Sequence, residues 1–319
     1  MQDEAGDVDL RDEEGEIRPE FLHAVVAALD TGEAAKLRDL ALPLHEADLA
    51  DLIELLRPEQ RTMLIATLGE DFDAATLPEL DEAVRDQVLE TMPSEQVAEA
   101  LQQLDSDDAV YVIEDLDKEE QTDILAKLPH FERLALERSR AYKEDSAGRI
   151  MQTDLIAVPP FWSVGQTIDY MREAEDLPDR FYELFVVDPA YHLLGSVALN
   201  SLLRAKRPTS IDAVTERDIH PIPVEADQEA VARQFERYNL TSAPVVDGGG
   251  RLVGVITADD IVEVVQEEAS EDILRMGGVA GERVSDSVWR TASHRFTWLF
   301  ANLLTAILAS FVISLFEAK

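Results

Sequence analysis

The stretches MPSEQVAEALQQ (92–103), LDSDDAVYVIED (104–115) and LDKEEQTDILAK (116–127) repeat one pattern every twelve residues. Each unit begins with a large apolar residue, which is followed by proline, serine or acidic residues of the kind that start helices. An apolar pair follows eight and nine positions after the first residue and lies on one helical face. Each unit therefore predicts one short amphipathic helix and a corner.

The same register extends in both directions from these three units. Its first positions are Leu44, Leu56, Leu68, Leu80, Met92, Leu104, Leu116 and Leu128. Helices of about two turns are not stable alone, so the units must stack and bury a shared apolar seam. We predict an all-α helical superhelix, of either hand, for residues 21–140. The acidic residues 1–20 before it are predicted to be a disordered tail.

A second repeat follows in the middle of the chain. Residues 184–201 and 243–260 both read as an apolar strand, a turn, a second apolar strand and the start of a helix. Asp188 and Asp247 are 59 residues apart, as are Gly195 and Gly254. A helix precedes each copy, at 163–174 with Ser163 as the N-cap and at 227–238 with Asp227 as the N-cap. Apolar strands of this kind indicate α/β units whose sheets are buried on both faces.

The composition restricts the partners. The chain has 319 residues, with 66 acidic and 28 basic side chains and a formal net charge of -38. This charge opposes binding to nucleic acid or anionic lipid and favours cations. A salt-rich cytoplasm is an alternative source of the acidity, because a strongly acidic surface also suits such an interior. There is no cysteine, which excludes disulfides and thiolate sites.

An acidic helix and an apolar segment complete the chain. Residues 259–276 contain no glycine or proline, and the predicted helix carries on its polar side Asp260, Glu263, Glu267, Glu268, Glu271 and Asp272. After a juxtamembrane segment, 277–295, residues 296–316 contain no charge and are long enough for a transmembrane helix. Basic residues on its N-terminal side predict the cell (inner) membrane, with residues 1–295 in the cytoplasm.

Nothing in the sequence is typical of an enzyme. The six histidines are scattered without metal-ligand spacing, and the triple glycine 248–250 lacks the strand-to-helix context of a phosphate-binding loop. We therefore predict no catalytic residues.

The middle of the chain resembles a tandem pair of CBS domains, which we place at 141–207 and 208–258. The flanking stretches 143–151, 226–233 and 267–273 resemble the MgtE magnesium channels, as does the order of superhelix, CBS pair, acidic connecting helix and membrane helix. The resemblance implies a homodimer through the CBS pairs and Mg²⁺ as both regulatory and transported ion. It assigns magnesium contacts to Asp260, Glu263, Glu268, Glu271, Asp272, Glu229, Glu236 and Asp107. Asn239 and Tyr111 depart from it, since acids are expected there.

Two questions stay open. The CBS ribose-binding pattern is present as Gly254, Thr257 and Asp260, while the first copy has Ala198 and Ser201 in the matching places, so a single site for ATP or another adenine nucleotide is an alternative use of Asp260. The corresponding alternative function is a membrane-tethered nucleotide regulator without transport activity. The family's pore uses five helices per subunit, and the chain includes the first. We therefore expect a truncated product, or a separate chain with the remaining helices, and no pore from this chain alone.

Overall fold

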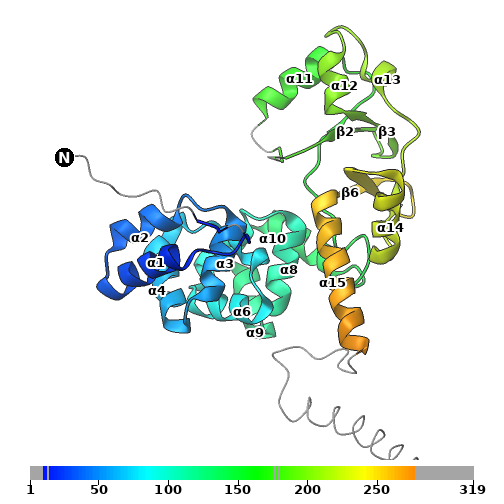
Figure 1. Ribbon diagram of the computed structural model, residues 1–319. Coiled ribbons are helices and arrows are strands. Elements are labelled where there is room, and N and C mark those ends of the chain that lie inside the picture. Colours follow the sequence, from blue (N-terminus) through cyan, green and yellow to red (C-terminus); the bar gives the residue numbers. More distant parts are fainter. Residues whose placement is uncertain (1–9, 13, 175–176, 179, 277–319) are drawn as a thin grey trace, which may run out of the picture. The chain divides into compact units, whose positions relative to one another are not determined.

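The computed structural model describes residues 10–276, except 13, 175, 176 and 179. The chain divides into two compact units. Among the described residues, the first contains those up to Asp227 and Thr241–Ile256, and the second contains Gln228–Leu240 and residues 257–276. Figure 1 shows the helical N-terminal part, in blue to green, and the strands that follow it in the sequence.

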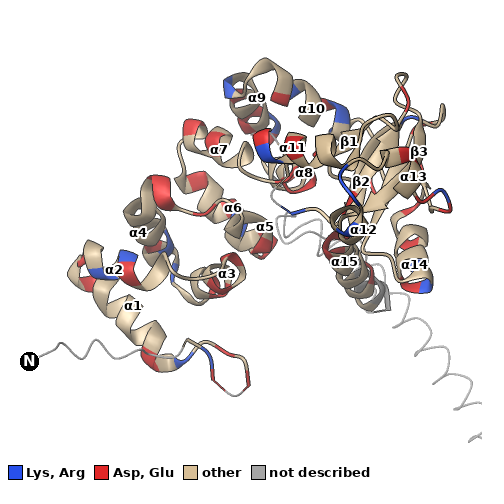
Figure 2. Cartoon of the chain, turned by 90° about the horizontal axis from the view of Figure 1, so that it is seen from above, with Lys and Arg blue, Asp and Glu red and all other residues tan. Residues whose placement is uncertain are grey.

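The N-terminal part is built from short helices. They are α1 (Pro19–Thr31), α2 (Ala34–Ala41), α3 (Glu46–Leu55), α4 (Pro58–Leu68), the 3₁₀ turn η1 (Gly69–Asp71), α5 (Thr76–Glu79), α6 (Glu82–Thr91), α7 (Ser94–Leu101), α8 (Ser106–Asp115), α9 (Lys118–Lys127) and α10 (His130–Arg140). The helices α6 to α10 start twelve residues apart, which confirms the repeat and the all-α class of this domain. Acidic residues, red on the ribbon of Figure 2, are spread over these helices.

The residues between successive helices explain why the repeat keeps its period of twelve residues. Leu56, Leu80, Met92, Leu116 and Leu128 each follow a helix with extended backbone angles, and their side chains are buried. The next helix then begins with strong capping chemistry. At α9, the Asp117 carboxylate accepts the N–H groups of Glu119 (2.8 Å) and Glu120 (2.9 Å), which satisfies two donors of the first turn.

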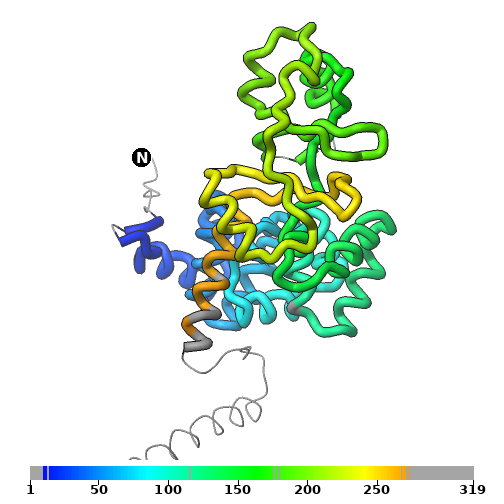
Figure 3. The backbone as a smooth tube through the Cα atoms, turned by 90° about the vertical axis from the view of Figure 1, so that its right-hand side faces the viewer, coloured from blue at the N-terminus to red at the C-terminus, as the bar shows by residue number. Residues whose placement is uncertain are grey.

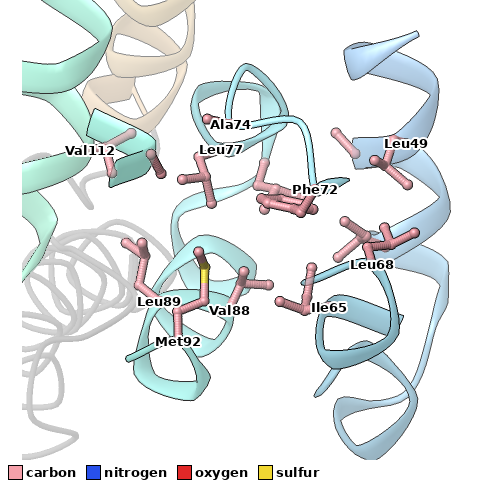
Figure 4. Close-up of a cluster of buried hydrophobic side chains, with 14 of the residues drawn as sticks. Leu49, Ile65, Leu68, Phe72, Ala74, Leu77, Val88, Leu89, Met92 and Val112 are labelled. Atoms are coloured by element: carbon pink, nitrogen blue, oxygen red, sulfur yellow. The ribbon is translucent and has the colours of Figure 1, made fainter. Parts of the chain in front are cut away.

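One core connects the stacked helices. Figure 4 shows how Leu68 and Ile65 from α4, Leu77 from α5 and Leu89 from α6 face a common interior. Burying each such side chain contributes about 1.5–3 kcal/mol. A helix of two or three turns is therefore held by its neighbours and not by its own backbone bonds.

The unit after α4 is irregular. The chain leaves α4 at Gly69 with φ 57° and ψ -124°, angles that glycine reaches more easily than other residues. The 3₁₀ turn η1 and the single turn of α5 replace the regular helix that the period would place there.

The prediction of a disordered tail over residues 1–20 is wrong for its second half. Arg11 and Ile17 form a β-bridge, and α1 begins at Pro19. Arg11 Nε donates to Asp48 Oδ1 (2.7 Å) and Nη2 to Asp51 Oδ2 (2.6 Å) on α3. These charge-assisted bonds hold the segment in place. Residues 1–9 lie outside the described part of the chain.

Two sheets follow, each with three strands. The first has the order β1-β2-β3, with β1 (Ala157–Val158) parallel to β2 (Glu183–Val187) and β2 antiparallel to β3 (Leu193–Ala198). The second has the order β4-β5-β6, with β4 (Ile222–Pro223), β5 (Ser242–Val246) and β6 (Leu252–Thr257). The helices are α11 (Val164–Glu173), α12 (Leu199–Arg204), α13 (Ile211–Val214), α14 (Gln228–Tyr238) and α15 (Ala258–Met276). This confirms the duplicated α/β units.

The paired glycines have a shared structural reason. The backbone of Ser196 exchanges two hydrogen bonds with Glu216, and the backbone of Val255 exchanges two with Gln152. A Cβ on Gly195 would lie 2.2 Å from Glu216 O, and a Cβ on Gly254 would lie 2.8 Å from Gln152 O. Each sheet therefore needs a glycine where a connecting segment crosses its last strand.

Candidate functional site

The acidic helix α15 forms the second unit together with α14. The two helices pack through buried apolar residues, which include Val231 and Phe235 on α14 and Ile261 and Val264 on α15. The tube in Figure 3 shows α15, in orange, running beside α14. The apolar side of α15 is therefore fixed against α14, and the carboxylates belong to a helix that this packing holds in place.

Asp260 has a structural role at the start of α15. Its Oδ2 accepts hydrogen bonds from the backbone N–H of Thr257 (2.7 Å) and from the Thr257 hydroxyl (2.9 Å). Asp259 Oδ1 is also within hydrogen-bonding distance of this hydroxyl, whose single proton can be donated to either carboxylate. Asp260 is the third residue of the helix, so it completes half of a capping box. The residue common to the magnesium and nucleotide hypotheses also caps the helix.

The other predicted carboxylates of this unit have different surroundings. Glu268 Oε1, half-buried, accepts from Gln228 Nε2 at 3.2 Å and so joins α15 to α14. Glu229 pairs with Arg233 at 2.6 Å, one helical turn further on, and both side chains are exposed. Glu236 and Glu263 are exposed. Glu268 is thus the predicted contact whose position is fixed by both helices.

Two predicted contacts and the membrane segment cannot be placed. Glu271 and Asp272 belong to α15, but their side chains lie outside those that the structure describes, as does the side chain of Glu267. The predicted transmembrane helix 296–316 also lies outside the described residues. Within the described range, none of the helices has the length and apolar character needed to cross a membrane.

Asn239, where an acid is expected, ends α14. Its φ is 51°, and the N–H of Leu240 after it donates to Phe235 O at 3.1 Å. This is the bonding pattern of a left-handed C-cap, a position that asparagine accepts better than most residues. The departure from the family pattern therefore has a local reason.

Tyr111, the second departure, covers a buried cation. Asp107 lies half-buried in the first turn of α8, and Tyr111 follows one turn later. The Tyr111 ring lies 4.3 Å from Cζ of Arg85, whose side chain is only 1% exposed. Arg85 Nη1 donates to Leu80 O (2.8 Å) and Pro78 O (3.3 Å). Sequence reasoning missed Arg85, because an arginine between Val84 and Asp86 reads as a surface residue.

The predicted contacts do not form a complete metal site within the described part of the chain. No three carboxylate or histidine side chains there come together as a set that could hold a metal ion. The donors are nevertheless of the type that Mg²⁺ prefers, because they are carboxylate oxygens and this ion keeps several of its waters.

The two hairpin turns carry a matched pair of aspartates. The pKa of Asp188 is lowered, first by the hydrogen bond from His192 Nδ1 (2.9 Å) and then by backbone N–H groups of the turn. The pKa of Asp247 is lowered too, chiefly by the backbone N–H of Arg251 (3.0 Å). These aspartates therefore belong to the turns and not to the candidate site.

Comparisons with known proteins give the family. Residues 44–145 match the model of the MgtE intracellular N domain, and residues 147–207 and 211–267 match that of the CBS domain. The magnesium transporter MgtE of Thermus thermophilus is 31% identical over 309 residues, which cover 91% of this chain and 66% of that protein. The chain belongs to the MgtE family. Magnesium transporter MgtE of Bacillus subtilis is 24% identical, over 93% of this chain and 66% of its own length.

Two solved structures have a similar fold. The soluble part of a magnesium transporter matches 78% of this chain with a TM-score of 0.71 and 25% identity, and 98% of that structure is covered. The cytosolic domain of the Mg²⁺ channel MgtE in complex with ATP matches 76% with a TM-score of 0.72 and 29% identity, and 99% of it is covered. The matched part of this chain therefore has the fold of that cytosolic domain.

Proposed function

We propose that this chain is the Mg²⁺-sensing cytosolic part of an MgtE-type magnesium transporter, followed by a first membrane helix at 296–316. In this proposal residues 1–295 lie in the cytoplasm and the chain is located in the cell membrane. The observation that supports it most is the acidic helix α15. The chain that contains this helix matches the cytosolic domain of the Mg²⁺ channel MgtE over three quarters of the chain's own length.

The physical basis is repulsion along α15. Five like-charged pairs lie three or four residues apart, namely 260/263, 263/267, 267/271, 268/271 and 268/272. At about 0.2–0.5 kcal/mol each, they destabilise α15 by about 1–2.5 kcal/mol before screening, and any further carboxylate brought against this face adds to the repulsion. A divalent cation bridged to these oxygens reverses the sign of this contribution. Scarce Mg²⁺ then favours an open arrangement and abundant Mg²⁺ a closed one.

The remaining predicted contacts would complete sites between parts of the assembly. Glu229 and Glu236 on α14 and Asp107 on α8 are the proposed partners of the α15 carboxylates. Glu229 must leave Arg233 to take this role, and an exposed ion pair of this kind costs little to break, about 0.2–1 kcal/mol. Glu268 keeps its place because Gln228 holds it.

Limited proteolysis of the chain tests the proposal. Millimolar Mg²⁺ should slow cleavage, and NaCl at equal ionic strength should not, because it screens charge without bridging carboxylates. Changing Glu268, Glu271 and Asp272 together to alanine should remove most of the Mg²⁺ response. A control variant with Glu59, Glu90 and Glu132 changed to alanine loses the same charge from exposed helical positions and should respond as the unchanged chain does. Equal protection by sodium, or a full response in the first variant, contradicts the proposal.

Adenine-nucleotide binding at the second CBS unit is a second candidate function. The similar cytosolic domain was solved in complex with ATP, and Thr257 and Asp260 of the ribose pattern are hydrogen-bonded to each other here. Thr257→Val removes the hydroxyl and keeps every carboxylate, so it should weaken ATP binding in calorimetry and leave the Mg²⁺ response unchanged. Ser201→Ala, at the matching place of the first unit, should change neither. ATP binding that survives Thr257→Val argues against this site.

We also infer a homodimer through the CBS pairs. Exposed apolar side chains that a second copy could cover include Phe161 and Leu203 in the first CBS unit and Val262, Val265 and Ile273 along α15. Sedimentation at micromolar concentration should give a dimer. A monomer both with and without Mg²⁺ would remove this part of the proposal.

A further inference from the structure

A buried amide lies against one of the predicted magnesium contacts. Gln228 is the first residue of α14, and its side chain is only 7% exposed. Its Nε2 donates a hydrogen bond to Glu268 Oε1 on α15 at 3.2 Å. The two residues are 40 positions apart, so this bond exists only because α14 packs on α15. The amide is therefore part of the surroundings of Glu268 and is not a chance surface contact.

The orientation of this amide follows from its partner. If the amide were reversed, its carbonyl oxygen would face a carboxylate oxygen, and neither atom can donate a hydrogen bond. The low exposure of Gln228 also limits the access of water that could replace the bond. Glu268 Oε1 is therefore engaged by the protein itself, through a bond to a charged acceptor, which is stronger than a bond between neutral groups.

The bond leaves the second oxygen of Glu268, Oε2, as the one that can bind a metal ion. A carboxylate held in this way offers the ion one oxygen and not two. Mg²⁺ suits this arrangement, because it needs near-octahedral geometry with oxygens at about 2.0–2.1 Å and keeps several of its waters. Ca²⁺ takes about six to eight oxygens at about 2.3–2.6 Å and accepts a carboxylate through both oxygens. A hydrogen bond to one oxygen therefore removes a ligand from Ca²⁺ and none from Mg²⁺.

We propose that Gln228 is a positioning residue that favours Mg²⁺ over Ca²⁺ at the α15 carboxylates by restricting Glu268 to one metal-binding oxygen. This inference rests on the proposed magnesium function and adds to it a residue that sets the choice of ion. Without the amide, both oxygens of Glu268 can turn toward a large ion, which gives Ca²⁺ an additional ligand. The carboxylate is also less fixed, which weakens binding of the ion with the stricter geometry.

The variant Gln228→Met tests this inference, because methionine has a similar length and no hydrogen-bond donor. Protection of the full chain from protease is measured against Mg²⁺ and against Ca²⁺ at constant ionic strength. The ratio of the Ca²⁺ midpoint to the Mg²⁺ midpoint should fall by about tenfold in Gln228→Met. The matched control is Gln234→Met, at a half-buried position of the same helix, which should keep the ratio of the unchanged chain.

Two further measurements separate the bond to Glu268 from general packing. A Glu268→Ala chain keeps the other α15 carboxylates but gives the amide nothing to hold, so adding Gln228→Met to it should leave the ratio unchanged. In EDTA, hydrogen exchange of the α15 backbone amides around position 268 should be faster in Gln228→Met than in Gln234→Met, because the bond joins α15 to α14. This second readout needs no metal.

The inference is overturned if Gln228→Met keeps the ratio of the unchanged chain, or if Gln234→Met lowers it as much. It is also overturned if the ratio falls when Gln228→Met is added to Glu268→Ala, or if exchange in EDTA is equal in the two glutamine variants. After any of these results, a Mg²⁺ response of the unchanged chain still supports the proposed function. An unchanged chain that responds to neither ion contradicts both.

Discussion

Replacing Tyr111 tests the role of the buried cation at Arg85. A cation–π contact contributes about 0.5–1 kcal/mol at exposed sites and about 2 kcal/mol or more when desolvated. The guanidinium is 1% exposed and the tyrosine 41% exposed, so the contact lies between these limits. We expect Tyr111→Leu to lower the free energy of unfolding by about 1–2 kcal/mol. Tyr111→Phe keeps the ring and should lose less than about 1 kcal/mol.

Urea unfolding followed by circular dichroism measures both variants. Tyr182→Leu is the control, because Tyr182 is an exposed tyrosine of the first CBS unit. It should shift the midpoint by less than Tyr111→Leu does. The reasoning is refuted if Tyr111→Leu is as stable as the unchanged chain, or if Tyr111→Phe loses as much as Tyr111→Leu. Either result would mean that the ring does not stabilise the buried charge.

Three smaller changes test the CBS units. Ser163→Ala removes the side chain that accepts the Gln166 N–H at the start of α11 and should cost about 1 kcal/mol in urea unfolding; no loss would argue against this cap. Gly195→Ala places a Cβ 2.2 Å from a backbone carbonyl oxygen and should cost about 1–3 kcal/mol or more; a stable variant would show that the crossing segment can move. The pKa of Asp188 is lowered in the folded chain, so its contribution is present above the ordinary value of 3.8 and is lost as the pH falls through the lower folded value. Asp188→Asn should remove that acid dependence from unfolding measured between about pH 5 and 2, and an unchanged profile would contradict the assignment.

The parts of the fold that follow local chemistry could be predicted from the sequence. A corner such as Leu116-Asp117 contains both the buried residue that ends one helix and the cap that starts the next. The duplicated strands could be aligned because the same turn and the same glycine recur. Position 195 accepts only glycine for a reason that the sequence does not show, which is the Glu216 carbonyl crossing the strand.

The parts that depend on distant partners could not be predicted. Arg11 is ordered by Asp48 and Asp51, which lie 37 and 40 residues later, so the local composition of the tail gave no sign of it. Arg85 is buried because two carbonyl oxygens before α6 and a ring on α8 surround it. In the candidate site, the helical spacing of the α15 carboxylates could be predicted from the sequence. The hydrogen bond from Gln228 to Glu268 could not, because these residues are 40 positions apart and meet only when α14 packs on α15.

The central claim is that Mg²⁺ changes the arrangement of the domains by bridging carboxylates. The chain has no cysteine, so Glu59→Cys on α4 and Ala190→Cys in the turn between β2 and β3 provide two unique labelling sites, both exposed and neither among the residues proposed for the dimer contact. Pulsed electron paramagnetic resonance between spin labels at these positions measures the distance distribution directly. We predict a narrower distribution at a new distance in millimolar Mg²⁺, no such change in NaCl of equal ionic strength, and loss of the Mg²⁺ effect when Glu268, Glu271 and Asp272 are alanine. A distribution that is the same with and without Mg²⁺ would contradict the account.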